Sequence, residues 1–335
     1  MEKMVNPKEF NYSINLVNNS YTCFWLSNTF CAFKSINDIF YIIYTNDKLS
    51  IISFDMIICK KINEIQNAHL KKITNLRYYL DKINTRDLLI SISGQDNNLK
   101  LWDIEKFECI LDMRNINSKG FLNSSILLID NNKHYLVTSN DDYEKIKTEC
   151  IKIFDLKGNK IKDINDSNEV TYFIDIYYDE KSSINYIIAC NRGNIISYNY
   201  KENKLYHEYY DFDNGDRGHF SAIIHKEKKL IKLIESSCDG NIRIWNFHTS
   251  DLLDKIEISG DGLREICLWD ENYLFVGCDD SKIFLIDIKG KKIIKELEGH
   301  DDKVLSIKKI DHPQYGICLI SQGVDGLIKL WKKIK

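Results

Sequence analysis

The sequence predicts an all-β protein built from copies of one small unit, and three segments carry this prediction. Residues 95–103 read QDNNLKLWD, residues 238–246 read CDGNIRIWN, and residues 324–331 read VDGLIKLW. In each segment an Asp that opens a tight turn precedes a Trp by six residues, with apolar and polar residues alternating between them. This period of two is typical of a half-buried strand, so each segment predicts a turn followed by a strand.

Weaker copies of the same strand lie before and between the three strong ones. Counted from the residue after the aromatic position, successive copies are 41 to 52 residues apart. A period of about 40 to 45 residues is typical of β-propellers with four strands in each blade. The sequence therefore predicts a seven-bladed β-propeller of four-stranded antiparallel blades that uses residues 1–335 as one domain. Blades one to seven are numbered by the copies that end at Asp55, Asp103, Asp155, Asn199, Asn246, Asp287 and Lys332.

Three copies are also preceded by a His, which is followed four residues later by Ile or Val. Together with the Asp-to-Trp strands, these residues resemble the WD-repeat family over essentially the whole chain. The resemblance implies a hydrogen-bonded network across a blade, made by the His, a strand Ser or Thr, the turn Asp and the Trp. Blade seven matches in full, while blades two and five keep three of the four members. The residues are His300, Ser321, Asp325 and Trp331 in blade seven, His69, Asp96 and Trp102 in blade two, and His219, Asp239 and Trp245 in blade five.

The hydroxyl position departs from this pattern in two blades. Four residues before the turn Asp, blade two has Ile92 and blade five has Glu235. A buried polar group that loses its partner costs about 1 to 3 kcal/mol. We therefore expect partial networks there, with Ser91, Ser93, Ser236 or water in compensation.

The last blade is expected to take its outermost strand from the other end of the chain. Only four residues follow Trp331, and an open sheet edge would be a site for unwanted pairing. Residues 8–17 alternate in the manner of a strand. We expect them to pair with the strand at 326–332 and to close the ring; the alternative is an unstructured tail.

Composition narrows the classes of partner and site. The net charge of -3 does not favour nucleic acid as a partner. The ten Cys are never closer than eight residues and form no CxxC pair, so we expect reduced thiols, a cytoplasmic or nuclear protein, and neither metal nor cofactor. The longest apolar run, residues 39–44, is too short to cross a bilayer, so no membrane partner is expected.

No pattern typical of catalysis is found in the sequence. The Asp pairs at 141–142, 279–280 and 301–302 fall in predicted turns, where Asp is favoured for backbone reasons. We therefore expect a noncatalytic scaffold for protein partners, a monomeric propeller within a larger complex. One alternative is a hydrolase-like enzyme that uses the central channel. Another is a substrate receptor of a ubiquitin ligase, although the Arg that such family members often carry two residues after the WD pair is missing here.

The resemblance also implies where a partner binds. In the family, contacts concentrate three and five residues after the His and one residue before the turn Asp, on the face formed by the loops between blades and the turns between second and third strands. Carried over, this rule and the cations near the same face give Lys72, Thr74, Gln95, Arg192, Arg217, Ala222, Ile224, Arg264, Asp279, Lys303, Leu305 and Val324.

Arg192 occupies the place of the turn Asp in blade four. Guanidinium groups favour planar carboxylate or phosphate partners, so the cations predict an acidic or phosphorylated peptide as ligand. The alternative is a mixed-charge rim in which Asp216, Asp279, Asp301 and Asp302 neutralise the cations. The charged segment at 140–149 is either a surface insertion or a further partner contact.

Overall fold

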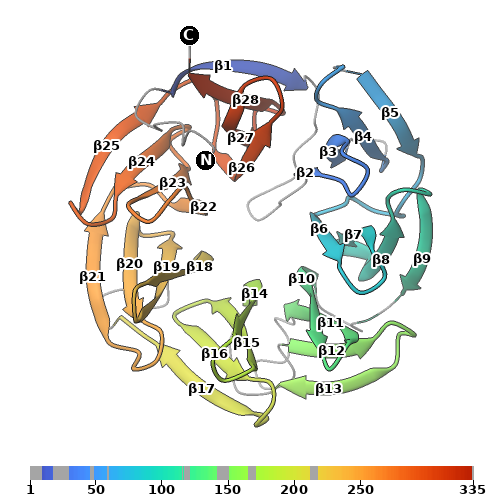
Figure 1. The fold of residues 1–335 in the computed structure, drawn as a ribbon, viewed down its shortest axis with the longest axis horizontal. Helices are drawn as coiled ribbons and strands as arrows, with labels where there is room; N and C mark the ends of the chain where they lie inside the picture. Colours follow the sequence, from blue (N-terminus) through green and yellow to red (C-terminus); the bar gives the residue numbers. More distant parts are fainter. Residues whose placement is uncertain are drawn as a thin grey trace. The chain divides into compact units, whose positions relative to one another are not determined.

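The seven expected blades are present in the computed structural model, which describes residues 10–17, 30–45, 49–58, 60–114, 116, 121–141, 151–164, 171–211 and 218–333. Within these residues, seven sheets of four antiparallel strands are formed, and the fold class is the all-β, seven-bladed β-propeller that the sequence predicted (Figure 1). A single turn of 3-10 helix, η2 (Gly94–Asp96), is the one helical element in this part of the chain.

The strands follow one another blade by blade along the sequence. Blade one consists of β2 (Phe30–Lys34), β3 (Phe40–Thr45), β4 (Ile51–Asp55) and β5 (Lys60–Ile65), and blade two of β6 (Asn75–Asp81), β7 (Arg86–Ser93), β8 (Asn98–Asp103) and β9 (Glu108–Met113). Blade three contains β10 (Phe121–Asp130), β11 (Lys133–Asp141), β12 (Ile151–Asp155) and β13 (Lys160–Ile164), and blade four β14 (Thr171–Asp179), β15 (Ile184–Asn191), β16 (Ile195–Asn199) and β17 (Lys204–Tyr209). Blade five contains β18 (His219–Glu227), β19 (Leu230–Ser237), β20 (Asn241–Asn246) and β21 (Leu252–Glu257), and blade six β22 (Leu263–Leu268), β23 (Tyr273–Cys278), β24 (Ile283–Asp287) and β25 (Lys292–Leu297). Blade seven is built from β26 (Val304–His312), β27 (Gly316–Gly323), β28 (Ile328–Lys333) and β1 (Phe10–Val17).

The chain divides into two compact units, which are described separately below. Unit 1 comprises Met1–Ala68, Ser236–Ile242 and Ile256–Lys335, and unit 2 comprises His69–Glu235 and Arg243–Lys255. Unit 1 holds blades one, six and seven, and unit 2 holds blades two, three and four; blade five contributes to both.

In each unit the core lies between successive blades. In unit 1, Trp331 at the end of the blade-seven strand packs in one cluster with Phe275 and Leu285 of blade six. In unit 2, Trp245 packs with Tyr186 and Tyr209 of blade four. The aromatic side chains that end the repeated strands thus fill the space between neighbouring sheets, where a large ring buries much apolar area.

The N-terminal strand completes the last blade, as the sequence predicted. β1 pairs antiparallel with β28 in unit 1, with Phe10 opposite Lys333, Ser13 opposite Trp331 and Val17 opposite Ile328. The strand covers residues 10–17 of the expected 8–17, and residues 8 and 9 lie outside the described residues. Its pairing occupies the edge that β28 would otherwise expose.

One side chain departs from the alternation that predicts the strands. Arg243 was expected on the polar face of its strand, opposite to Ile242 and Ile244, yet its side chain is fully buried. The reason is that two carboxylates of unit 2 lie within reach of its guanidinium group, as described below. The expected excursion at 140–149 falls almost entirely outside the described residues, because 142–150 are not among them.

Candidate functional site: blade networks and rim segments

The network of blade seven is continuous from the rim of the blade into its core. Trp331 Nε1 donates to Ser321 Oγ at 2.7 Å, and Ser321 Oγ lies 2.7 Å from His300 Nε2. His300 Nδ1 lies 2.7 Å from Asp325 Oδ2, and since a carboxylate can only accept, Nδ1 carries the proton. Asp325 also accepts the main-chain N–H groups of Asp301 and Leu327, which ties the segment before β26 to the turn before β28.

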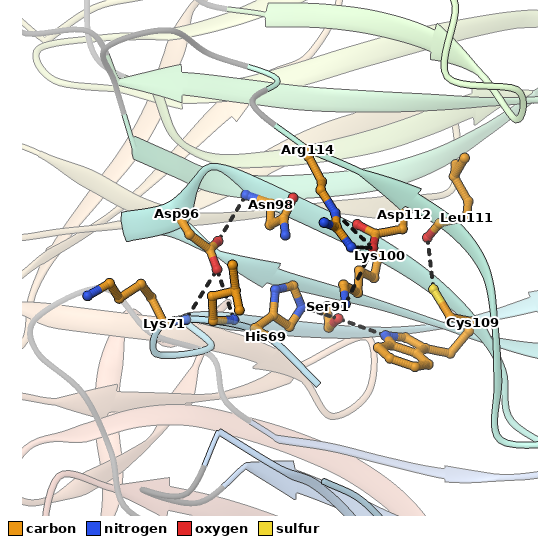
Figure 2. Close-up of polar contacts among 12 residues, drawn as sticks. His69, Lys71, Ser91, Asp96, Asn98, Lys100, Cys109, Leu111, Asp112 and Arg114 are labelled. Atoms are coloured by element: carbon orange, nitrogen blue, oxygen red, sulfur yellow. Dashed lines mark hydrogen bonds and ion pairs between the residues drawn. The ribbon is translucent and has the colours of Figure 1, made fainter. Parts of the chain in front are cut away.

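Blade two keeps the His, Ser and Trp of this network but places its Asp differently (Figure 2). Trp102 Nε1 donates to Ser91 Oγ at 2.8 Å, and Ser91 Oγ lies 2.7 Å from His69 Nε2. Asp96 Oδ2 accepts the main-chain N–H groups of Leu70 and Lys71 at 3.2 Å, while Nδ1 of His69 has no hydrogen-bond partner among the described residues. Ser91 therefore supplies the hydroxyl that Ile92 cannot, as expected, and the network remains partial.

The physical reason lies in the length of the turn. Ser91 and Asp96 are five residues apart, whereas Ser321 and Asp325 are four apart. In blade two the pair Ser93–Asn98 leaves four residues, 94–97, in the turn between β7 and β8. In blade seven the N–H of Gly323 bonds to the carbonyl of Leu327 and leaves three residues, 324–326. The turn therefore carries its Asp one residue further from the Ser.

In blade five, a carboxylate replaces the hydroxyl, and the network consists of ion pairs. The fully buried Glu235 accepts a short hydrogen bond from His219 Nδ1 in unit 2, and its second oxygen lies 3.6 Å from Arg243 Nη1. Arg243 Nε donates to Asp211 Oδ2 at 2.7 Å, and Lys255 Nζ lies 3.0 Å from the same oxygen. Buried charges are retained when they are paired with opposite charges, and each charge of this cluster has such a partner, although Glu235 Oε1 has no hydrogen-bond partner among the described residues.

Two other polar groups of blade five differ from the expectation. Ser236, expected to compensate for the missing hydroxyl, instead donates to the main-chain carbonyl of Arg264 at 2.5 Å in unit 1. The indole N–H of Trp245 has no hydrogen-bond partner among the described residues. Asp239 accepts the main-chain N–H of Asn241 at 3.1 Å and so closes its turn.

The surroundings shift the pKa values of these groups in opposite directions. Burial, reinforced by the charge of Lys100, lowers the pKa of His69 to about 3. Burial would also lower the pKa of His219, but the charge and the hydrogen bond of Glu235 outweigh it, and the pKa is raised. For Asp325, the upward effect of burial is outweighed by the hydrogen bond and charge of His300, so its pKa lies below the usual range.

Three of the predicted partner-contact residues lie together on the rim of unit 1. Arg264 and Asp279 form a bidentate pair, with Nε to Oδ1 at 2.6 Å and Nη2 to Oδ2 at 2.7 Å. Lys303 Nζ lies 3.0 Å from the same carboxylate. The two cations raise the local positive charge, and despite its burial the pKa of Asp279 is lowered. Leu305, two residues after Lys303 in the sequence, is buried. Val324 is half-buried, and its main-chain N–H donates to the carbonyl of Lys303.

The predicted contact residues of unit 2 have varied surroundings. Thr74 is hydrogen-bonded to its own blade: its Oγ1 accepts the main-chain N–H of Gly94, and its main-chain N–H donates to the carbonyl of Ile92. Lys72 and Ile224 are half-buried, Ala222 is buried, and Arg192 is exposed. Gln95 lies in η2, and Arg217 lies outside the described residues.

Several residues of these sites could not be singled out from the sequence. Asp211 and Arg243 meet only through the fold, although Glu235 in the hydroxyl position was a visible signal. Arg77 of β6 bonds to the Ile174 carbonyl at 2.7 Å and to Asp175 Oδ1 at 2.8 Å in β14, and thus joins blades two and four. Its position on an ordinary alternating strand gave no signal.

The described residues contain no group of three or more His, Cys, Asp or Glu side chains placed to hold a metal ion. Within the same part of the chain, no helix has the length and apolar character needed to span a membrane. The turn carboxylates Asp279 and Asp280 are bonded to side chains or main chain, the latter to the N–H of Lys282.

Seven four-stranded sheets define a seven-bladed β-propeller, and blade seven contains the His–Ser–Asp–Trp network that the resemblance to the WD-repeat family implies. Comparison with known proteins agrees: residues 291–332 match the family model described as WD domain, G-beta repeat. This match and the fold confirm the resemblance to the WD-repeat family.

Known relatives match over about a third of the chain. The chain is 29% identical over 99 residues to the U3 small nucleolar RNA-associated protein 21 homolog of Schizosaccharomyces pombe, and the aligned segment covers 30% of this chain and 11% of that protein. It is 26% identical over 98 residues to WD repeat-containing protein 36 of Homo sapiens, covering 29% and 11%. It is 30% identical over 100 residues to the probable coatomer subunit beta' of Schizosaccharomyces pombe, covering 29% and 12%. The chain thus matches only about a ninth of the length of these relatives.

Proposed function

We propose that this protein is a noncatalytic scaffold that binds protein partners through the rim segments of its blades, the loops before the first strands and the turns between second and third strands. The observation that carries the proposal is how firmly these segments are bonded in unit 1. Asp325 holds the segment at Asp301, the N–H of Val324 bonds to the carbonyl of Lys303, and the N–H of Asp279 bonds to the carbonyl of Gly262. A surface fixed in advance loses little conformational entropy when a partner binds.

The charge of the rim bears on the class of partner. In unit 1 both Arg264 and Lys303 are already paired with Asp279, which favours the mixed-charge rim over a free anion site at this point. In unit 2, Arg192 and Lys71 are exposed, and an acidic or phosphorylated peptide is the class of ligand that such cations favour. We propose such a ligand for unit 2, with Arg192→Ala as the variant that weakens its binding and an array of phosphorylated and unmodified peptides as the measurement.

The relatives suggest the setting in which the scaffold works. One is named as a subunit of coatomer, and another as associated with a small nucleolar RNA. We infer that this chain likewise acts as one propeller within a larger assembly. Its described cysteines are free thiols, which is consistent with a cytoplasmic or nuclear protein.

The test is affinity purification of the full chain with mass spectrometry, using two matched charge reversals. Asp302 is exposed on the rim of unit 1, and Glu271 is exposed in the turn between β22 and β23 of the same unit. Asp302→Lys is expected to lose partners that the unaltered chain retains, whereas Glu271→Lys retains them. If both variants retain the same proteins, or if only chaperones are recovered, the proposal is wrong.

A further inference from the structure

At the turn between β7 and β8 of blade two and the segment of His69 beside it, four buried polar atoms lack a hydrogen-bond partner in the part of the chain that the structure describes. Among the described residues, His69 Nδ1, Ser93 Oγ, Asn97 Oδ1 and Asn98 Oδ1 have no hydrogen-bond partner. The side chains of His69, Ser93 and Asn98 are 2%, 0% and 3% exposed. Unpaired buried groups cost about 1 to 3 kcal/mol each, so four in one turn call for an explanation.

These atoms belong to two segments that are held together. Ser93 and Asn98 are opposite each other at the end of the ladder between β7 and β8, and Asn97 is the left-handed residue of the turn, with φ of 54°. Asp96 bonds to the main-chain N–H groups of Leu70 and Lys71 and so fixes the segment of His69 against this turn (Figure 2). Asn97 is half-buried, which places the group just beneath the surface.

The hydrogen-bonding character of the group follows from its neighbours. Ser91 Oγ accepts the indole N–H of Trp102, and the acceptor for its own hydrogen among the described residues is His69 Nε2. The proton of the imidazole is therefore on Nδ1, as in blade seven, and points to no carboxylate here. Because burial lowers the pKa of His69 to about 3, the ring stays neutral at physiological pH. The turn thus offers one N–H donor, two amide oxygens as acceptors and one hydroxyl that can act as either.

This set fits a primary carboxamide, which has two N–H donors and one carbonyl acceptor. A charged group fits less well, since Asp96 opposes an anion while the exposed Lys71 opposes a cation. Next to the turn, Leu70 is 74% exposed and offers an apolar contact.

We propose that the blade-two turn binds the side-chain carboxamide of an Asn or Gln in a partner segment, with an apolar neighbour of that residue against Leu70. This rests on the proposed function, since the segment belongs to a protein partner. The two N–H groups of the carboxamide bond to the amide oxygens of Asn97 and Asn98, and its carbonyl accepts from His69 Nδ1. Entry requires the side chain of the half-buried Asn97 to move.

The test uses three synthetic probes and the full chain. The probes are the capped dipeptides acetyl-Leu-Gln-N-methylamide, acetyl-Leu-Glu-N-methylamide and acetyl-Leu-Lys-N-methylamide, in which only the Gln side chain carries a primary carboxamide. They are titrated while side-chain amide and imidazole signals are followed by NMR. Only the Gln probe is expected to give saturable shifts at His69, Asn97 and Asn98. Asn98→Ala and Asn97→Gly, the latter compatible with a positive φ, are expected to weaken it about tenfold, the effect of about 1.4 kcal/mol.

Asn241→Ala is the matched control, because Asn241 follows its turn Asp by two residues and donates its N–H to it, as Asn98 does. This variant is expected to bind the Gln probe as the unaltered chain does. Equal shifts from all three probes, no saturable shift, or the same loss in Asn241→Ala would overturn the carboxamide site. None of these results depends on the rim of unit 1, so the proposed function stands or fails separately through Asp302→Lys.

Discussion

Blades seven and two contain the same His, Ser, Trp and Asp side chains, yet only blade seven joins all four into one network. In blade seven the proton on His300 Nδ1 has a carboxylate acceptor, whereas the corresponding atom of His69 has no partner among the described residues. The Asp is present in both blades and in both accepts main-chain N–H groups of the preceding loop. The difference is a single residue of turn length between the Ser and the Asp.

This comparison teaches that the Asp has two separable tasks. Fixing the loop before the blade requires only that its carboxylate accept a main-chain N–H there. Asp325 accepts that of Asp301, and Asp96, in the longer turn of blade two, accepts those of Leu70 and Lys71. Satisfying the His requires in addition that the carboxylate reach Nδ1 of the ring, and in blade two this hydrogen bond is missing among the described residues. Blade five extends the comparison, because there Glu235 serves the His directly and brings a buried Arg with it.

The largest loss of stability is expected when the buried ion pairs of blade five are broken. Arg243→Met removes the cation that faces both Asp211 and Glu235, and uncompensated buried charges cost about 3 to 5 kcal/mol. Urea unfolding followed by circular dichroism measures the loss. Lys255→Met removes a partly exposed partner of the same Asp211 and is expected to cost less than about 1 kcal/mol. Equal losses in the two variants would mean that the buried cluster is no more important than a surface pair.

The next largest effect is the loss of stability when the network histidine of blade seven or of blade two is replaced. His300→Ala breaks two side-chain hydrogen bonds, whereas His69→Ala breaks one and also removes an unpaired donor. We expect about 2 to 4 kcal/mol for His300→Ala and about 1 to 2 kcal/mol for His69→Ala. The same unfolding measurement applies. A larger loss at His69 would show that its Nδ1 has a partner in solution.

The sequence predicted the fold, the complete network of blade seven and the partial network of blade two. The spacing of His300, Ser321, Asp325 and Trp331 predicted a full network in blade seven, and its hydrogen bonds are present in the structure. The fold class and the pairing of the N-terminal strand with the last blade followed from the repeat period and from alternation. These features depend on residues close in sequence, and local patterns carry them well.

The rest depends on residues that only the fold brings together. A fixed distance of four residues misplaced the hydroxyl of blade two, because the turn is one residue longer and Ser91 takes the role. The alternation of the strand placed Arg243 on the polar face. Its partner Asp211 lies 32 residues away, so the residues around Arg243 do not indicate that it is buried in an ion pair. The pairing of Arg264 and Lys303 with one carboxylate was only one of two alternatives until their distances were known.

A further effect concerns pH and distinguishes the two histidines by the sign of their pKa shifts. The pKa of His69 falls from 6.5 to about 3 on folding, so between these values the unfolded chain binds a proton that the folded chain does not. Its contribution to stability is present above pH 6.5 and is lost as the pH falls, by up to about 1.4 kcal/mol per pH unit. His69→Gln is expected to flatten this slope in unfolding free energies measured from pH 7 to pH 4.

His219 provides the control for this sign. Its pKa is raised on folding, so its contribution is fully present below pH 6.5 and is lost as the pH rises through the folded value. His219→Gln is therefore expected to change the slope above pH 6.5, in the opposite direction. If both substitutions altered the same part of the pH profile, the assignment of opposite shifts would be wrong.

The smallest effect on stability is expected at the most exposed residue of the comparison. Leu70 is 74% exposed and follows His69, whereas Asp301, which follows His300, is polar at the same place. Leu70→Ser removes little buried area, and its N–H can still bond to Asp96, so the unfolding free energy should change by less than about 0.5 kcal/mol. Binding of acetyl-Leu-Gln-N-methylamide, in contrast, should weaken, because the apolar contact of the Leu side chain is lost. A fall in stability without a fall in binding would assign Leu70 to the fold of blade two and not to its surface.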